Sequence, residues 1–480
     1  MEKTKNTQRI IKYIGVLLTA SIYLLIFSLN TSPLYDWQVG DATIFRMLGV
    51  LAHRGMVPYT EFFDHKGPFI ILVEYLGACI SHKPFGNLIV QIPFTFFSFL
   101  GIKRIVDYFV YNTKSVKILV YIVSLLIYII YIPNNLTEEY CMPFLIWSCF
   151  FAIRYISEKE SKHNLWWSFL YGITIMVCVL TRITNVIPLA GMLLVGMIVM
   201  IKRKDHFFKN LLVIIGGMAV FALPFIIYFV VHNAFYDMFY ASIIYNFKYA
   251  ANIGTNFSVT LLLNILVRKL LLVVFAMIVS IMSIMTKKNK ELSYAVLISS
   301  VLAIILQLTS NLGFTQYLAV QVPIIVIAIC LLAKLESDKI FVKVVAYCVI
   351  IIGAILLVLN IGLKAKDLLK VRHNDASYQL KKESEEIIKK IDRDANVIAY
   401  NIDSYFYIVS GINPCYKYCI LQDWQSKLDK EMQKEIIKDF KSLKAEYVVE
   451  DIGKGRYDSV IDKHYKEVYR TKQLKLLKRK

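Results

Sequence analysis

The segment VPYTEFFDHKGP, residues 57–68, gathers ionisable side chains in a chain that is otherwise strongly apolar. Carboxylates take protons from hydroxyl groups, and cationic side chains hold phosphate groups. This mixture therefore fits a substrate that presents both a hydroxyl to deprotonate and a phosphate to bind. Its members are Glu61, Asp64, His65 and Lys66.

Other polar residues are expected on the same face of the protein, because the apolar runs described below place their loops there. Ionisable groups at a bilayer surface are candidates for function. The segment 32–85 adds two acids upstream, and four later loops add two acids, two cations and two tyrosines. These residues are Asp36, Asp41, Glu138, Glu139, Arg182, Tyr245, Lys248 and Tyr317.

The elements that must position these residues are membrane helices. The 480 residues are 57% hydrophobic and 19% charged, with a mean hydropathy of +0.55, whereas soluble domains are rarely more than about half apolar. Repeated apolar runs predict a polytopic α-helical membrane protein with about eleven crossings. The runs are 12–31, 86–111, 118–133, 141–157, 166–180, 186–201, 210–231, 270–286, 292–309, 317–333 and 341–363.

The basic residues predict the orientation. Every second loop is rich in Lys and Arg, and the loops between them are poor in both, which is the pattern of cytoplasmic and outer loops. The N-terminus is basic, so we place it in the cytoplasm and the C-terminus outside, in a bacterial cell membrane. Because most of the basic residues lie in loops between apolar runs or in the C-terminal segment, the net charge of +20 favours a bilayer over nucleic acid as the partner. The N-terminal cations are Lys3, Lys5, Arg9 and Lys12.

Two short apolar segments lie within the first outer loop, 32–85. The segment 69–80 is only about a dozen residues long and carries Glu74. A crossing there would turn every later Lys-rich loop outward, so we predict a re-entrant or juxtamembrane helix instead. The segment 42–55 is amphipathic and predicts a second helix of this kind.

The composition becomes polar after residue 363, which divides the chain into a membrane domain, 1–363, and a C-terminal domain, 364–480. In the latter, helical segments alternate with short apolar strands, so we predict a small extracytoplasmic α/β domain. We assign its basic end, KQLKLLKRK, to a solvated or head-group-facing tail. Whether Cys415 and Cys419 form a disulfide stays open.

The stretch GDATIFRMLGVLAHRGMVPYTEFFDHKGP, residues 40–68, resembles the first outer loop of GT-C polytopic glycosyltransferases. The similar branch includes bacterial protein mannosyltransferases and aminoarabinose transferases. Members have an Asp near the start of this loop, a G-x-x-P-Y-x-D/E step, and a Lys before Gly-Pro or Pro-Pro at a juxtamembrane helix. LTEEY, 136–140, resembles their second acidic motif, and LTRITNVIP, 180–188, is similar to a basic outer-loop element.

The resemblance implies an inverting hexosyl or pentosyl transfer from a polyprenyl-phosphate sugar to a glycan, lipid or protein acceptor of the cell envelope. In that scheme Asp41 is the general base, and Lys66 and Arg182 bind the lipid phosphate. Glu138 or Glu139 is the second acid. The other candidates are substrate-binding residues: Asp36, Glu61, Asp64, His65, Tyr245, Lys248 and Tyr317.

The resemblance leaves a divalent metal ion open, with Asp64, His65 and Glu138 as its ligands. Relatives often carry a His-Tyr pair in the last outer loop, where this chain has Gln316 and Tyr317, which weakens a metal site at that place. The spacing of Cys and His residues matches no zinc motif.

Two other classes of function compete with the transferase. Many spans with few charges are also typical of a transporter or of a flippase for lipid-linked glycans. A transporter is expected to show repeats, broken helices and charges inside its spans, whereas here the polar residues collect on one face. A scaffold without catalytic activity is the third alternative.

Overall fold

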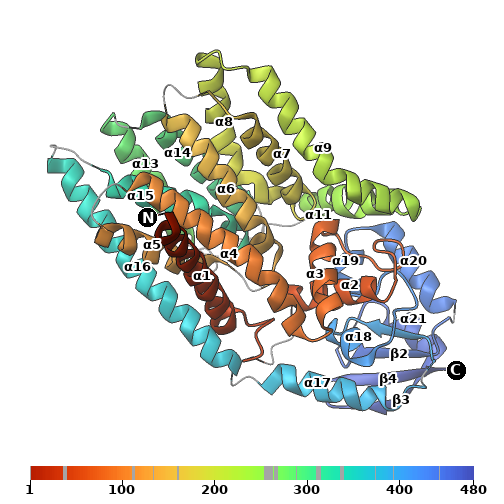
Figure 1. Cartoon of the computed structure of the whole chain (residues 1–480). Helices are drawn as coiled ribbons and strands as arrows, with labels where there is room; N and C mark the ends of the chain where they lie inside the picture. Colours follow the sequence, from red (N-terminus) through yellow and green to blue (C-terminus); the bar gives the residue numbers. More distant parts are fainter. Residues whose placement is uncertain are drawn as a thin grey trace.

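The computed structural model describes most of the chain, and the bundle and C-terminal domain are shown in Figure 1. The residues left undescribed are short stretches, most of them in loops. They are 1, 36–39, 111–113, 133–134, 159–161, 253–262, 264–268, 288, 310–314, 336–339, 373–374, 393, 443 and 454.

Long apolar helices dominate the structure. Within the described residues, nine helical segments are long and apolar enough to cross a membrane. They are α1 (Glu2–Phe27), α4 (Pro84–Phe109), α5 (Lys114–Tyr131), α6 (Thr137–Ser157), η1 with α8 (Ile183–Val186, Ile187–Lys202), α9 (Phe207–Val231), α14 (Lys290–Thr309), η4 with α15 (Thr315–Gln321, Val322–Ala333) and α16 (Ile340–Arg372).

These helices account for nine of the eleven predicted crossings. The other two apolar runs form the 15-residue helices α7 (Leu165–Val179) and α13 (Leu271–Met285). At 1.5 Å per residue each is about 22 Å long, shorter than a hydrocarbon core of about 30 Å. The prediction of a polytopic helical membrane protein is confirmed.

The two juxtamembrane helices expected in the first outer loop are present, as α2 (Asp41–His53) and α3 (Pro68–Ile80). They pack closely on each other. A Cβ on Gly49 would lie 2.4 Å from the carbonyl carbon of Glu74, so only glycine allows this approach. Figure 1 shows α2 and α3 at the end of the bundle that also carries the C-terminal domain, and we call this the site end.

The C-terminal domain has a four-stranded sheet in the order β1-β2-β4-β3. Strand β1 (Val397–Tyr400) is parallel to β2 (Tyr447–Asp451), and β4 (Leu474–Arg479) lies antiparallel to β2 and to β3 (Tyr465–Arg470). Its helices are α17 (Asp375–Ile388), α18 (Tyr405–Ser410), α19 (Gln422–Ser426), α20 (Lys430–Lys441) and α21 (Asp458–His464).

Two sequence predictions need correction here. The basic end of the chain is not a solvated tail, because Leu474, Leu476 and Leu477 are buried in strand β4 at the centre of the sheet. The alternation of apolar and basic residues in LKLLKR is that of a half-buried strand. In addition, α16 continues to Arg372, so the change in composition at 364 falls inside a helix.

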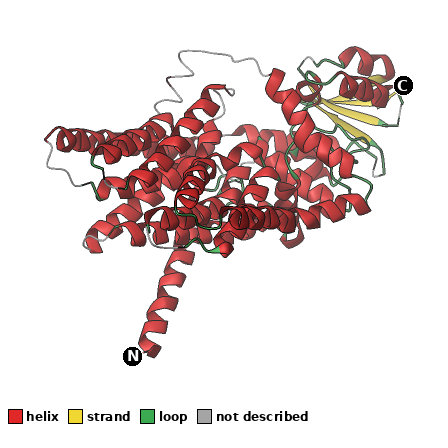
Figure 2. Ribbon diagram, turned by 90° about the horizontal axis from the view of Figure 1, so that it is seen from above, coloured by secondary structure: helices red, strands yellow, loops and turns green. Residues whose placement is uncertain are grey.

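The C-terminal domain packs on the site end through α2 and a bridging segment, α10 (Phe235–Phe239), η2 (Tyr240–Ile244) and α11 (Tyr245–Asn252). Arg54, after α2, donates to the carbonyl oxygens of Tyr407 and Ile412 at 3.1 and 3.3 Å. Figure 2 shows the sheet at one end of the bundle. The N-terminal helix projects from the body of the bundle, away from the sheet.

Candidate active site

The charged segment 57–68 folds into a closed loop between α2 and α3. Tyr59 has a φ of 68°, and its backbone N–H donates to the carbonyl of Phe62 at 2.8 Å. Its buried hydroxyl donates to the carbonyl oxygen of Lys66 at 2.7 Å. These two hydrogen bonds close the loop and hold residues 64–66 just before the N-terminus of α3.

This loop docks on the segment that follows α7. The backbone N–H of Gly67 donates to the carbonyl of Thr181 at 3.1 Å, and that of Phe69 donates to Leu180 at 2.9 Å. A Cβ on Gly67 would lie 2.2 Å from the carbonyl oxygen of Leu180, so a side chain is excluded there. Glycine at this position brings Lys66 beside Arg182, although 116 residues separate them in sequence.

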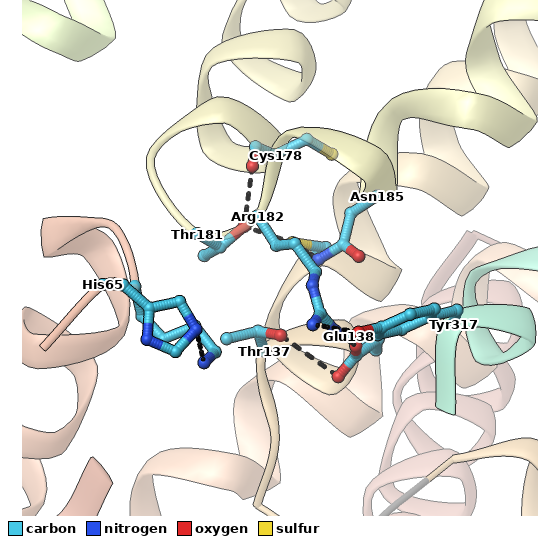
Figure 3. Close-up of polar contacts among 10 residues, drawn as sticks. His65, Thr137, Glu138, Cys178, Thr181, Arg182, Asn185 and Tyr317 are labelled. Carbon is cyan, nitrogen blue, oxygen red and sulfur yellow. Dashed lines mark hydrogen bonds and ion pairs between the residues drawn. The ribbon is translucent and has the colours of Figure 1, made fainter. Parts of the chain in front are cut away.

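Arg182 connects a carboxylate and a tyrosine from two other helices. Its Nη1 donates to Oε1 of Glu138 at 3.1 Å, and its Nη2 donates to the hydroxyl of Tyr317 at 2.8 Å. The guanidinium carbon also lies 4.0 Å from the centre of the Tyr317 ring. Figure 3 shows Arg182 reaching from its loop toward Glu138 and Tyr317, with His65 on its other side.

A second cation lies next to this cluster. Lys66 is buried, and its Nζ donates to Nε2 of His65 at 2.8 Å. Burial lowers the pKa of His65 well below its ordinary value, and the charges of Lys66 and Arg182 lower it further. The imidazole is therefore neutral and accepts from the ammonium, which has two other N–H donors for a ligand.

Asp64 braces the same turn. Its Oδ1 accepts the backbone N–H of Lys66 at 2.8 Å. Burial raises the pKa of this carboxyl, and the neighbouring Lys66 opposes that shift. The acid therefore fixes the backbone beside the cation.

Asp41 is exposed at the first position of α2 and faces the same region. Its charge acts on the pKa values of both Asp64 and Tyr317, which places the carboxylate near the two clusters. The preceding residue, Gly40, has a φ of 78°, a conformation that favours glycine. The backbone of Gly40 also hydrogen-bonds to the carboxylate of Asp403 in the C-terminal domain.

The structure separates several predicted residues from this group. Glu61 is exposed and accepts the N–H of Val57 within its own loop. Glu139 accepts from Asn135 and Gln91 instead of facing Arg182, because consecutive helical residues point about 100° apart.

Tyr245 and Lys248 bind the C-terminal domain. The Tyr245 hydroxyl donates to the carbonyl of Gln425 at 2.9 Å, and Lys248 lies 2.9 Å from Oδ2 of Asp429. Both residues therefore hold the two domains together, although the Tyr245 ring centre is still 5.9 Å from that of His65. Asp36 lies outside the described residues.

Of the three proposed metal ligands, Asp64 and His65 lie together, with Oδ1 and Nδ1 4.0 Å apart, but Glu138 does not join them. Across the part of the chain that the structure describes, no three His, Cys, Asp or Glu side chains form a group able to hold a metal ion. Glu138 pairs with Arg182, and Nε2 of His65 receives the Lys66 ammonium. The residues present therefore do not fit the metal site proposed from sequence.

Cys415 and Cys419 are both free thiols in the structure. Burial raises the pKa of each thiol, to about 11 for Cys415 and about 12 for Cys419. They therefore act as packing residues of the C-terminal domain.

An apolar groove begins at Pro68, at the N-terminus of α3. It has a volume of about 650 Å³ and runs between α3 and α9. Pro68 and Phe69, the residues that follow Lys66 and Gly67, line it together with Leu72, Val220 and Phe225. The described residues of the lining carry no charged side chain and suit a hydrocarbon chain, and Lys66 lies two residues before Pro68 in sequence.

Two further residues contact His65. Asn246 is one of the polar residues that the loop pattern places on this face, whereas Trp424 was not predicted from the sequence. Asn246 donates to the carbonyl of His65 at 2.7 Å, and the ring centre of Trp424 lies 5.8 Å from that of His65. Asp403, which binds Gly40, was also missed. Trp424 and Asp403 lie in polar segments with no motif, so only the fold identifies them.

Comparison with known proteins supports this architecture. No family model and no curated protein matches the sequence. Crystal structures of ArnT from Cupriavidus metallidurans share its fold, in the apo state with a TM-score of 0.59 and bound to undecaprenyl phosphate with a TM-score of 0.53. Each is 11% identical, and 98% of both chains is covered. The GT-C-like fold expected from the sequence is confirmed.

Proposed function

We propose that this protein is a membrane glycosyltransferase that transfers a sugar from a polyprenyl-phosphate donor to a hydroxyl group of an acceptor. The observation that carries the proposal is that Lys66 and Arg182 lie on two segments joined by the hydrogen bond from Gly67 to Thr181, and that the residues directly after Gly67 line an apolar groove. Glu138 pairs with Arg182, and the charge of Asp41 acts on Asp64 and Tyr317. A cationic head site and a hydrocarbon groove together match a lipid phosphate. The fold shared with a protein crystallised with undecaprenyl phosphate supports the same ligand.

The proposed donor is a phosphodiester that joins the anomeric carbon of the sugar to the lipid phosphate. The acceptor oxygen attacks the anomeric carbon from the face opposite the phosphate, and its proton passes to the carboxylate of Asp41. The bond between the anomeric carbon and the phosphate oxygen breaks, and the oxygen keeps the electron pair. The anomeric configuration is inverted.

The leaving lipid phosphate gains one negative charge in this step. Lys66 and Arg182 would stabilise that charge, because they are fixed by the protein before the reaction begins. Arg182 is held in place by Glu138 and Tyr317, and the planar guanidinium keeps further N–H donors for the phosphate. Glu138 thus orients Arg182, which in turn would bind the phosphate.

We expect an acceptor of the bacterial cell envelope and a site end outside the cytoplasm, as the alternation of basic loops predicts. The metal ion left open by the sequence is not needed in this scheme, in which Lys66 and Arg182 neutralise the phosphate.

The test is a transfer assay with purified protein and a panel of polyprenyl-phosphate hexoses and pentoses. Wild type should consume a donor, and Asp41→Asn should lower kcat by about 10²–10⁴-fold while donor binding persists. Asp237→Asn is the matched control, since this acid of the site end pairs with Lys417. Wild-type rates in Asp41→Asn would disprove the base, and a protein that neither binds nor consumes any donor would refute the transferase.

A further inference from the structure

Glu74 is a buried acid that the proposed reaction does not use. It lies in the apolar helix α3 and has no exposed surface. Its Oε1 accepts from Nδ2 of Asn135 at 2.9 Å, and its Oε2 accepts from Nδ2 of Asn87 at 2.5 Å. Burial raises the pKa of this carboxyl to about 8. A group this costly to bury normally has a specific role.

Asn135 links Glu74 to α6 through hydrogen bonds. Its backbone N–H donates to Oε2 of Glu139 at 2.9 Å, and its Oδ1 accepts from the hydroxyl of Tyr140. The φ of Asn135 is 61°, in the left-handed region that asparagine tolerates better than most residues. Its amide group is therefore fixed at both ends, two residues before α6 begins and three before Glu138.

Glu74 also fixes the helix that begins with Asp41. Gly49 of α2 packs directly against the backbone of Glu74. From the same helix, the buried guanidinium of Arg46 donates to the carbonyl of His82 at 2.8 Å, and its charge acts on Glu74. One residue thus contacts α2 directly and α6 through Asn135.

We propose that Glu74 and Asn135 form a clamp that sets Asp41 and Glu138 at the spacing required for sugar transfer. Glu74 is then a positioning residue, which acts through α2 and α6 without touching the substrate. This inference rests on the proposed function. Displacements of about 1 Å in reacting groups lower rates by about 10²-fold, so a clamp of this kind has a large effect on rate.

A donor–acceptor swap tests the clamp. In Glu74→Gln the new amide N–H₂ faces that of Asn135, and in Asn135→Asp two carboxylates face each other. In the double variant the glutamine N–H₂ donates to the new aspartate. Its carbonyl accepts from Asn87, and the second aspartate oxygen accepts from Tyr140. The three side-chain hydrogen bonds, 74 to 135, 74 to 87 and 135 to 140, are all kept. Only the bond between positions 74 and 135 exchanges its donor and acceptor.

Each single variant should lower kcat by about 10–100-fold with little change in the KM for donor, and the double variant should recover most of the loss. A merely structural role would lower the amount of folded enzyme and leave the kcat of the folded fraction unchanged. A double variant no better than the product of the two single losses would overturn the clamp.

Backbone amide exchange over residues 135–142 provides a readout without activity. Exchange should accelerate in each single variant and return toward the wild-type rate in the double variant. If wild type transfers no sugar, the proposed function fails while this measurement still decides the clamp. Wild-type exchange rates in both single variants would refute it.

Tyr140→Phe keeps the clamp testable if a single variant does not fold. It removes only the hydroxyl that fixes the Asn135 amide, so exchange at 135–142 should rise several-fold. Tyr171→Phe is the control, because its hydroxyl meets His163 in a separate polar cluster. Equal exchange in the two variants would count against the clamp.

Discussion

Arg182 and Glu138 form an ion pair of 3.1 Å between a short loop and the first turn of α6, with the acid almost wholly buried. Breaking a buried pair is costly, because it leaves the remaining charge without a partner. This pair gives the guanidinium a defined orientation, and we propose that it binds the donor phosphate in that orientation.

Arg182→Lys keeps the charge and removes the planar fork. A lysine has one nitrogen and cannot contact Glu138 and Tyr317 with the same geometry. We expect kcat for sugar transfer to fall on the order of 10²-fold. The control is Arg154→Lys, which affects a partly exposed pair with Glu158 and should keep the wild-type rate. Equal rates in Arg182→Lys and wild type would show that the fork has no role.

Gly67→Ala should destabilise the protein by about 1–3 kcal/mol, because its Cβ would meet the backbone of Leu180. The loop must shift to relieve this clash, which moves Lys66 away from Arg182 and weakens donor binding. The measurements are Tm and donor affinity. Gly196→Ala is the matched control, since no atom outside its own helix turn lies within 4 Å of the position of its Cβ. A normal Tm in Gly67→Ala would contradict the docking of the loop.

Val220→Trp should fill the apolar groove. Val220 lines this cavity and is 58% exposed, so a larger side chain fits without disturbing the core. We expect the KM for a long-chain donor to rise about tenfold, equivalent to about 1.4 kcal/mol. A donor with two isoprene units should be unaffected.

The control for the groove is Leu170→Trp, which lines a second apolar cavity of about 540 Å³ between α4, α6 and α7. It should leave both KM values unchanged. If Val220→Trp slows short-chain and long-chain donors equally, the groove does not hold the lipid tail.

His65 predicts a loss of stability at acidic pH. Its folded pKa lies well below the ordinary value of 6.5, so between the two values only the unfolded chain binds the proton. The stabilisation is therefore present above 6.5 and is lost as pH falls. The His65 contribution to this loss grows as the pH falls further below 6.5.

His65→Gln isolates this contribution, because the amide oxygen still accepts from Lys66 and does not titrate. The drop in Tm between pH 7.5 and pH 5.5 should be smaller in the variant than in wild type. Other groups face the imidazole, namely Asp64, Lys66 and Arg182, and they are the same in both proteins. An identical drop would place the acid sensitivity elsewhere.

The sequence by itself determined the apolar helices of the bundle: eleven were predicted, and within the described residues nine are long enough to cross a membrane while two, α7 and α13, are shorter. Apolar runs and local composition predict α2, α3 and the short strands of the C-terminal domain other than β4, because these signals arise within about 10–20 residues. The strand β4 was mistaken for a tail, since its basic residues dominate a short pattern whose buried face becomes evident only against β2 and β3.

The tertiary structure decided which polar residues meet. Two adjacent acids, Glu138 and Glu139, are equivalent in the sequence, but the helix turns one toward Arg182 and the other toward Asn135. Lys248 looks like a site cation and instead binds Asp429. The physical reason is that such contacts join residues far apart in the chain, so they depend on how helices pack and not on any local pattern.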